Sequence, residues 1–217
     1  DAALVHPRPI PAPRIDTDLA YTDSQMLIYG LTGSIAMGKS TAARMLRHFG
    51  LPVYDSDYVV HEFYKSDAVE LLRPYFPDAI ISGTVDRVSL SNYVLNSPEN
   101  LRKLESIVHP YVEKQREDFL AFKKLSGSKI VFVDIPLLFE IGDERMVDRI
   151  VVVSASEETQ RSRALARANM TIAKFEAIKS KQIPDTDKRR MAHYIISSDH
   201  GFDHMRSQIK SLLRSVN

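Results

Sequence analysis

The residues with the clearest chemical pattern lie at 33–40, where the sequence reads GSIAMGKS. This has the form G-x-x-x-x-G-K-S, which is typical of a loop that binds the phosphates of a nucleotide. Gly33 and Gly38 allow the chain to curl so that several backbone N–H groups converge on an anion. Lys39 is expected to reach the β- and γ-phosphates, and the Ser40 hydroxyl is expected to bind Mg²⁺.

A loop of this kind must be held between a strand and a helix. Residues 26–32 (MLIYGLT) form a short apolar run that favours a strand. Residues 41–49 follow the loop, with Ala42, Met45, Leu46 and Phe49 at helical spacing, and Gly50 stands where a helix C-cap would fall. The alternative, a chance Lys-Ser after a glycine-containing turn, does not account for this strand–loop–helix order. The stretch is therefore predicted to bind a nucleotide.

Acidic residues follow two other predicted strands. Residues 51–54 are a short second strand followed by Asp55 and Asp57, and residues 129–134 are a buried third strand that ends in Asp134. Open α/β sheets bind ligands beyond the carboxyl ends of their strands. Asp55 or Ser56 is expected to cap the helix near residues 58–65, which leaves another acid free to face a substrate. Asp134 is interpreted either as a Mg²⁺ partner through water or as a capping or hydrogen-bonding group.

The remaining pattern predicts an α/β fold with a five-stranded parallel sheet flanked by helices. Residues 149–153 and 194–197 supply the fourth and fifth strands, and 202–216 a final amphipathic helix. The core is assigned to residues 26–57 and 127–217. About seventy residues of helical pattern separate the second and third strands, which is too much for a simple crossover. Residues 58–126 are therefore predicted to be an inserted helical domain, with one helix ending at His109-Pro110. Residues 1–25 contain a proline-rich stretch and are predicted to be an extended arm.

The composition sets modest limits. The chain has 217 residues, 44% hydrophobic and 26% charged, and a net charge of +1. This is ordinary for a globular protein and gives no bulk electrostatic case for binding nucleic acid or a membrane. Absence of cysteine excludes disulfides and thiolate chemistry, and fits a cytoplasmic location. A monomer or a weak homo-oligomer is expected.

Residues 160–190 are strongly basic, with nine lysines and arginines against Glu176, Asp185 and Asp187. Such a run is commonly a solvated helix face. Beside a phosphate loop it has a second interpretation, as a cationic lid whose arginines neutralise the charge of a transferring phosphoryl group. Arg163 and Arg167 are spaced i, i+4 and would lie on the same face of a helix.

From Met26 to about its C-terminus, the chain resembles the dephospho-coenzyme A kinases. The resemblance rests on several separated motifs in order: GLTG at 30–33 leading into the phosphate loop, VYDSD at 53–57, LESIVHP at 104–110, IPLLFE at 135–140, DR at 148–149, TQ at 159–160 with Arg163 and Arg167, and Gln182. It implies a P-loop NTPase core with a lid at about 160–190. It also implies transfer of the γ-phosphoryl group of ATP to the ribose 3′-hydroxyl of dephospho-CoA, the last step of coenzyme A synthesis.

The resemblance also implies roles for particular residues. Asp57 is the expected base, with Lys39 and Arg163 as further catalytic residues. Acceptor contacts are expected at Thr32, Asp57, His109 and Leu137, although His109 has the alternative of a buried structural histidine. Ser40 is the expected Mg²⁺ ligand. The expected ATP-binding residues are Gly33, Ser34, Ile35, Ala36, Met37, Gly38, Lys39, Ser40, Thr41 and Arg167.

The chain departs from the family pattern in a few places. Ser34 and Ala36 stand where glycines are common, and their side chains are expected to face away from the phosphates. Lys188 replaces a usual arginine, His193 a usual acid, and Ser197-Ser198 a usual asparagine, all near the expected adenine pocket and lid base. The sequence has two alternative interpretations. Another small-molecule or nucleoside monophosphate kinase of the same architecture stays open, whereas a GTPase-type switch is disfavoured because no Asn-Lys dipeptide is present.

Overall fold

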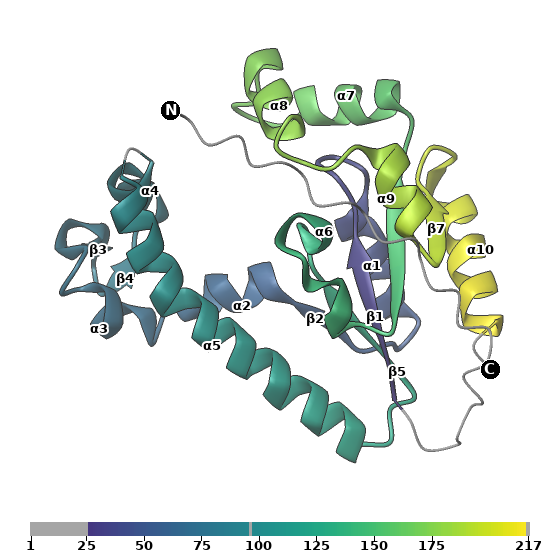
Figure 1. Ribbon diagram of the computed structural model, residues 1–217, viewed down its shortest axis with the longest axis horizontal. Helices are drawn as coiled ribbons and strands as arrows, with labels where there is room; N and C mark the ends of the chain where they lie inside the picture. The colour runs from purple at the N-terminus through teal and green to yellow at the C-terminus, as the bar shows by residue number, and fades with distance from the viewer. Residues whose placement is uncertain (1–25, 96, 216–217) are drawn as a thin grey trace.

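The structure is a computed structural model that describes residues 26–95 and 97–215 (Figure 1). The predicted arm at residues 1–25 lies outside this range. Among the described residues, no helix is long and apolar enough to cross a membrane.

The centre of the molecule is a five-stranded parallel sheet in the order β2-β5-β1-β6-β7 (Figure 1). The predicted α/β fold is confirmed. β5 is buried along its whole length and β6 along nearly all of it, which explains why their sequences are continuous apolar runs. The strands are β1 (Leu27–Thr32), β2 (Val53–Asp55), β5 (Ile130–Asp134), β6 (Arg149–Ser154) and β7 (Tyr194–Ser197).

Helices cover both faces of the sheet. On one face lie α1 (Lys39–His48) and α10 (Gly201–Arg214), whose Leu46 and Ile209 are fully buried in the main core. On the other face, α6 (Leu138–Ile141) packs Leu138 into a second cluster. A short 3₁₀ turn, η2 (Asp143–Met146), leads from α6 to β6.

The segment between β2 and β5 has its own core, set to one side of the sheet (Figure 1). Phe63, Leu72 and Phe76 are fully buried there, and the ring of Phe63 stacks on that of Tyr111 with centroids 4.1 Å apart. The elements are α2 (Ser56–Phe63), α3 (Ala68–Leu72), η1 (Pro77–Ala79), β3 (Ile80–Ile81), β4 (Thr84–Val85), α4 (Arg87–Val94) and α5 (Pro98–Leu125).

The long helix α5 corrects one prediction. A helix was expected to end at His109-Pro110, but α5 is 28 residues long and continues through Pro110. Proline has no N–H group, so Pro110 leaves the carbonyl of Ser106 without its helical donor. Both residues lie on the exposed face of α5, where water can hydrate that carbonyl. His109 is also exposed, so its interpretation as a buried structural histidine is wrong.

Helix α5 returns to the sheet and contacts β2. The hydroxyl of Tyr54 donates to the carbonyl of Val112 (2.8 Å), and the rings of Tyr54 and Phe119 lie 5.5 Å apart. Burial raises the pKa of Tyr54 to about 12, so its hydroxyl stays protonated and keeps this donor. The helical segment is therefore attached to the sheet at the strand that precedes Asp57.

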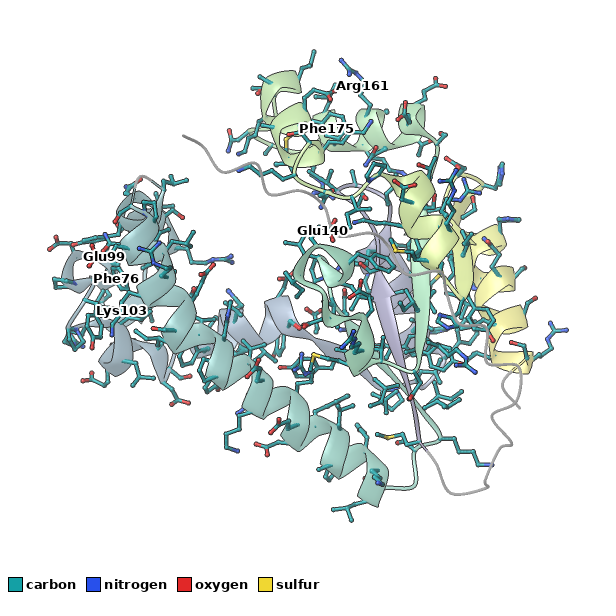
Figure 2. All side chains as sticks on the ribbon, viewed as in Figure 1. Phe76, Glu99, Lys103, Glu140, Arg161 and Phe175 are labelled. Carbon is teal, nitrogen blue, oxygen red and sulfur yellow. The ribbon has the colours of Figure 1, made fainter. Side chains whose placement is uncertain are left out.

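The basic stretch forms three short helices, α7 (Glu157–Leu165), α8 (Ile172–Lys179) and α9 (Asp185–Met191). Of these, α7 and α8 lie beyond the carboxyl ends of the strands while α9 packs beside the sheet (Figure 1). Phe175 is buried between the lid and the phosphate loop (Figure 2). Ion pairs join exposed side chains, Arg161 with Glu176 and Lys179 with Glu157, each at 3.1 Å. Part of the basic charge is thus solvated and locally paired.

Gly33 is required where β1 enters the phosphate loop. A Cβ at Gly33 would lie 2.6 Å from the carbonyl oxygen of Val153 on β6, a backbone atom that can move only with its strand. At Gly30 a Cβ would instead meet methyl groups of Leu138 and Val147 at 3.1 Å, and side chains yield more easily.

We therefore predict that Gly33→Ala destabilises the protein by about 2 kcal/mol, within the usual range for overpacking, and weakens ATP binding. Gly30→Ala is the matched control and should cost less in both respects. Denaturant midpoints of the three proteins measure the difference. Equal midpoints for the two variants would contradict the close contact.

Candidate active site

A cavity of about 500 Å³ opens at the carboxyl edge of the sheet. Segments that follow four strands contribute to it: the phosphate loop after β1, Asp57 after β2, Pro136 after β5 and Ser198 after β7. The lid and α10 complete its wall. Its lining residues are Gly33, Ser34, Ile35, Ala36, Met37, Gly38, Lys39, Ser40, Thr41, Asp57, Pro136, Arg163, Arg167, Gln182, Ser198, Gly201, Phe202 and Met205.

The phosphate loop has the backbone shape that its sequence predicts. Gly38 has a φ of +95°, a left-handed conformation that favours glycine, and α1 begins at the next residue. The N-terminal end of α1 therefore points its unpaired N–H groups and its positive dipole end at the cavity. An anion is the ligand that this end of the cavity favours.

Lys39 forms an ion pair with Asp134 at the end of β5. Both side chains are largely buried, with 15% and 6% of their surfaces exposed. Burial raises the pKa of Asp134, and the positive charge of Lys39 opposes that rise. The hydrogen-bonding interpretation of Asp134 is confirmed, with the phosphate-loop lysine as its partner.

The two aspartates after β2 have different surroundings. Asp55 caps α2 by accepting from the N–H of Tyr58 (3.0 Å), as expected for one of the polar residues here, and pairs with Arg47 at 3.0 Å. Asp57 lies in the first turn of α2, is exposed and borders the cavity. A carboxylate that faces the phosphate loop across an open cavity can accept a proton from a bound hydroxyl.

Arg163 reaches the cavity from α7 and is held by Ser198. Its two terminal nitrogens donate to the hydroxyl (2.6 Å) and the carbonyl (2.8 Å) of Ser198. The Ser198 hydroxyl in turn donates to the carbonyl of Met37 in the phosphate loop (2.8 Å). Ser198 was predicted only to lie near an adenine pocket, so its contact with the lid arginine is new. A small side chain suits position 198, because Gly38 lies close to it. A Cβ atom added at Gly38 would be 3.1 Å from the side chain of Ser198.

Three predicted acceptor contacts do not line this cavity. Thr32 is fully buried, and its hydroxyl donates to the carbonyl of Pro136 at 3.3 Å. His109 is exposed on α5, and Leu137 is exposed beside α6. Their roles stay predictions.

The cavity also includes residues that the sequence interpretation missed. Phe202 and Met205 come from the start of α10, and Phe202 is 65% exposed. The apolar spacing of this segment predicts a helix, but it does not show which apolar side chains pack in the core and which face a ligand. Gln182 could have been found from the sequence, because it is one of the residues on which the family resemblance rests, but no role was assigned to it.

Lys188 and His193, which were expected near the adenine pocket and the lid base, are not among the residues that line the cavity. Lys188 is fully buried, and its ammonium group lies 2.7 Å from a carboxylate oxygen of Glu140. Glu140 lies on α6 beneath the lid (Figure 2). The Nδ1 atom of His193 accepts from the N–H of Ile150 (3.1 Å); burial and the nearby Arg149 lower the pKa of His193 and favour this neutral form.

We predict that Lys188→Met destabilises the protein by about 3 kcal/mol, because it leaves the Glu140 carboxylate buried without its partner. Lys65→Met, which removes one partner of the exposed Lys65–Glu62 pair, is the matched control and should cost under about 1 kcal/mol. Urea denaturation measures both, and Lys188→Met with Glu140→Gln should recover part of the loss. If Lys188→Met lowers the free energy of unfolding no more than the control does, the buried ion pair contributes no more to stability than an exposed one.

Comparison with known proteins identifies the family. A family model described as dephospho-CoA kinase matches residues 27–204. A dephospho-CoA kinase of Rhodopseudomonas palustris (strain HaA2) is 46% identical over 188 residues, which are 87% of this chain and 94% of the relative. One of Agrobacterium fabrum (strain C58 / ATCC 33970) is 45% identical over 88% of this chain and 98% of the relative.

Solved structures agree with the fold. A crystal structure of a Thermus thermophilus protein superposes with a TM-score of 0.74 and 33% identity, covering 89% of this chain and 99% of the other. A dephospho-CoA kinase from Campylobacter jejuni has a TM-score of 0.65, with 22% identity over 88% of this chain and 98% of the other, and supports the fold alone. With a family match across most of its length and relatives at nearly half identity, the chain belongs to the dephospho-CoA kinase family.

Proposed function

We propose that the cavity brings ATP and dephospho-CoA together and transfers the γ-phosphoryl group to the ribose 3′-hydroxyl, which yields coenzyme A. Family membership supports the overall reaction. The observation that carries the assignment of the site is that Lys39, Asp57 and Arg163, which come from distant parts of the sequence, line one cavity.

The phosphate loop and the start of α1 hold the triphosphate in this mechanism. The backbone N–H groups of the loop and the helix dipole favour the anion. The ammonium group of Lys39 moves from Asp134 to the β- and γ-phosphates. Arg163 and Arg167 stabilise the charge on the transferring group from the lid side, which is the general role of such arginines.

Asp57 orients the acceptor hydroxyl and takes its proton. The 3′-oxygen forms a bond to the γ-phosphorus as the bond to the β–γ bridging oxygen breaks, the proton passes to the Asp57 carboxylate, and ADP leaves. A base at hydrogen-bond distance contributes most when proton loss accompanies attack. Asp57 has the exposure that a hydroxyl needs to approach it, whereas Asp55 is occupied as a helix cap.

The donor atoms fit a magnesium ion that arrives with the nucleotide. No cluster of three or more acidic or histidine side chains that could hold a metal is present in the part of the chain that the structure describes. Mg²⁺ commonly binds through a few protein oxygens, substrate phosphates and water. The Ser40 hydroxyl at the start of α1 would hold it, and Asp134 at the end of β5 would act through water. When bound, it neutralises phosphate charge.

We assign acceptor binding to the helical segment at 58–126, with donor binding at 26–57 and 127–217. The separate core around Phe63 and Phe76 supports this division, since it gives the segment a stable shape of its own. The cytoplasmic location and the monomeric or weakly oligomeric state stay predictions.

A coupled assay of ADP release tests the proposed reaction. The purified chain with ATP and Mg²⁺ should release ADP when dephospho-CoA is added, and mass spectrometry should find coenzyme A. Adenosine, AMP and shikimate serve as competing acceptors. Faster phosphorylation of one of these than of dephospho-CoA would favour the alternative of another small-molecule kinase.

A further inference from the structure

The phosphate loop is hydrogen bonded to the lid through both backbone groups of Ile35. The N–H of Ile35 donates to Oε1 of Gln182 (2.9 Å), and the carbonyl of Ile35 accepts from Nε2 of Gln160 (2.9 Å). Gln160 lies on α7, where the lid leaves the core, and Gln182 follows α8, where the chain returns. The two ends of the lid therefore meet at one residue of the loop.

Side-chain packing joins the same two parts. Ala36 is buried against Ala164 and Phe175 of the lid, and Ile35 and Met170 pack against this cluster. Ala36 has a φ of +60°, a left-handed conformation that is unfavourable for alanine, so its contacts must hold it there. The methyl group that replaces the usual glycine faces the lid.

The core supports Gln182 through its neighbour. The N–H of Ile183 donates to Oε1 of Glu140 (3.0 Å), and the same oxygen lies 2.7 Å from the ammonium group of Lys188. The backbone on one side of Gln182 is thus held by a buried ion pair. Gln160 is itself only 1% exposed, so its side chain has little freedom to leave Ile35.

We propose that Gln160 and Gln182 are positioning residues that clamp Ile35, so that the loop keeps its phosphate-binding shape only while both ends of the lid are seated. The N–H of Ile35 then serves the lid rather than a phosphate. Binding of phosphate to the loop and placement of Arg163 and Arg167 become one coupled event. This inference rests on the proposed transfer from ATP.

The two contacts differ in direction, which makes them separable by mutation. Gln160 donates and Gln182 accepts, and methionine has a similar length but can do neither. The clamp is therefore opened at its α7 end by Gln160→Met and at its α8 end by Gln182→Met. The double variant opens both ends. Arg161→Met is the matched control, because Arg161 adjoins Gln160 but forms its ion pair within the lid, with Glu176.

Steady-state kinetics of the full chain give the first readout. Each glutamine variant should raise KM for ATP by about 3- to 10-fold, the usual weight of one hydrogen bond, with KM for dephospho-CoA unchanged. Because one open end already frees the loop, the double variant should lose less than the product of the single losses. The clamp would be overturned if the rise in KM for ATP in the double variant equalled the product of the two single rises. An equal rise in KM for dephospho-CoA would also overturn it.

Amide hydrogen exchange without nucleotide gives a second readout that does not depend on activity. The segment 33–38 should exchange faster in both glutamine variants than in the native chain and in Arg161→Met. Unchanged exchange at Ile35 would overturn the clamp even if activity falls. A native chain that fails to phosphorylate dephospho-CoA would count against the proposed function and leave the exchange result to decide the clamp.

Discussion

Lys39→Ala is expected to lower kcat/KM by about 10³-fold or more, the upper end of the loss for one group that stabilises a transition-state charge. The substitution removes the lysine of the phosphate loop, which we propose binds the β- and γ-phosphates. The coupled ADP assay measures the change. Near-normal turnover would show that Lys39 is not the phosphate lysine.

The structure adds a second expected effect of Lys39→Ala, on stability. Asp134 loses the positive charge that opposes the effect of burial, so its pKa rises further. A carboxyl group whose pKa is higher in the folded than in the unfolded protein favours folding at low pH. That contribution is lost as the pH rises from the ordinary value of about 4 through the folded value. The variant should therefore melt at a lower temperature at pH 8 than at pH 5, with a steeper decline than the native protein.

Asp134→Asn separates the two effects. Combined with Lys39→Ala, it should remove the extra pH dependence and restore stability, because no buried carboxylate remains without a partner. It should not restore turnover, because the phosphates still lack the lysine. Thermal melts from pH 5 to pH 8 check the first statement and the ADP assay checks the second. A pH dependence that survives in the double variant would place its origin elsewhere.

Asp57→Asn is expected to lower kcat by about 10²- to 10⁴-fold, the usual contribution of a general base. Asparagine keeps the shape of the side chain but cannot accept the proton. Asp57 is exposed at the cavity, so the fold should tolerate the change and ATP affinity should vary little. Single-turnover rates and ATP titration distinguish loss of chemistry from loss of binding.

Asp55→Asn is the matched control, two residues away. It weakens the pair with Arg47 but keeps a good helix cap, so stability should fall by less than about 1 kcal/mol and kcat should hardly change. If Asp55→Asn is inactive and Asp57→Asn is active, the base has been assigned to the wrong carboxylate.

Much of this arrangement follows from local patterns in the sequence. The loop at 33–40, the buried run at 130–134 and the Asp55 cap depend on residues close together in the chain, and their spacing predicts their structure. The five strands were predicted within two residues at every end. β5 and β6 were the clearest, because parallel strands buried on both faces read as apolar runs.

The features that could not be predicted depend on residues far apart in the sequence. Lys188 belongs to a run of charged residues, and nothing near it shows that Glu140 will be buried opposite it. The ion pair of Lys39 with Asp134 likewise forms only when two neighbouring strands align their ends. Pro110 ends a helix by local rules, but an exposed position and packing on both sides of it let α5 continue.

Helix α2 carries Asp57 in its first turn and buries Phe63, its last residue, in the core of the helical segment. Asp57 therefore stands at the junction between the donor-binding core and the helical segment. A tilt of α2 that follows a change in the packing of Phe63 would move the Asp57 carboxylate relative to the phosphate loop. The shape of the acceptor side of the molecule thus bears directly on the position of the proposed base.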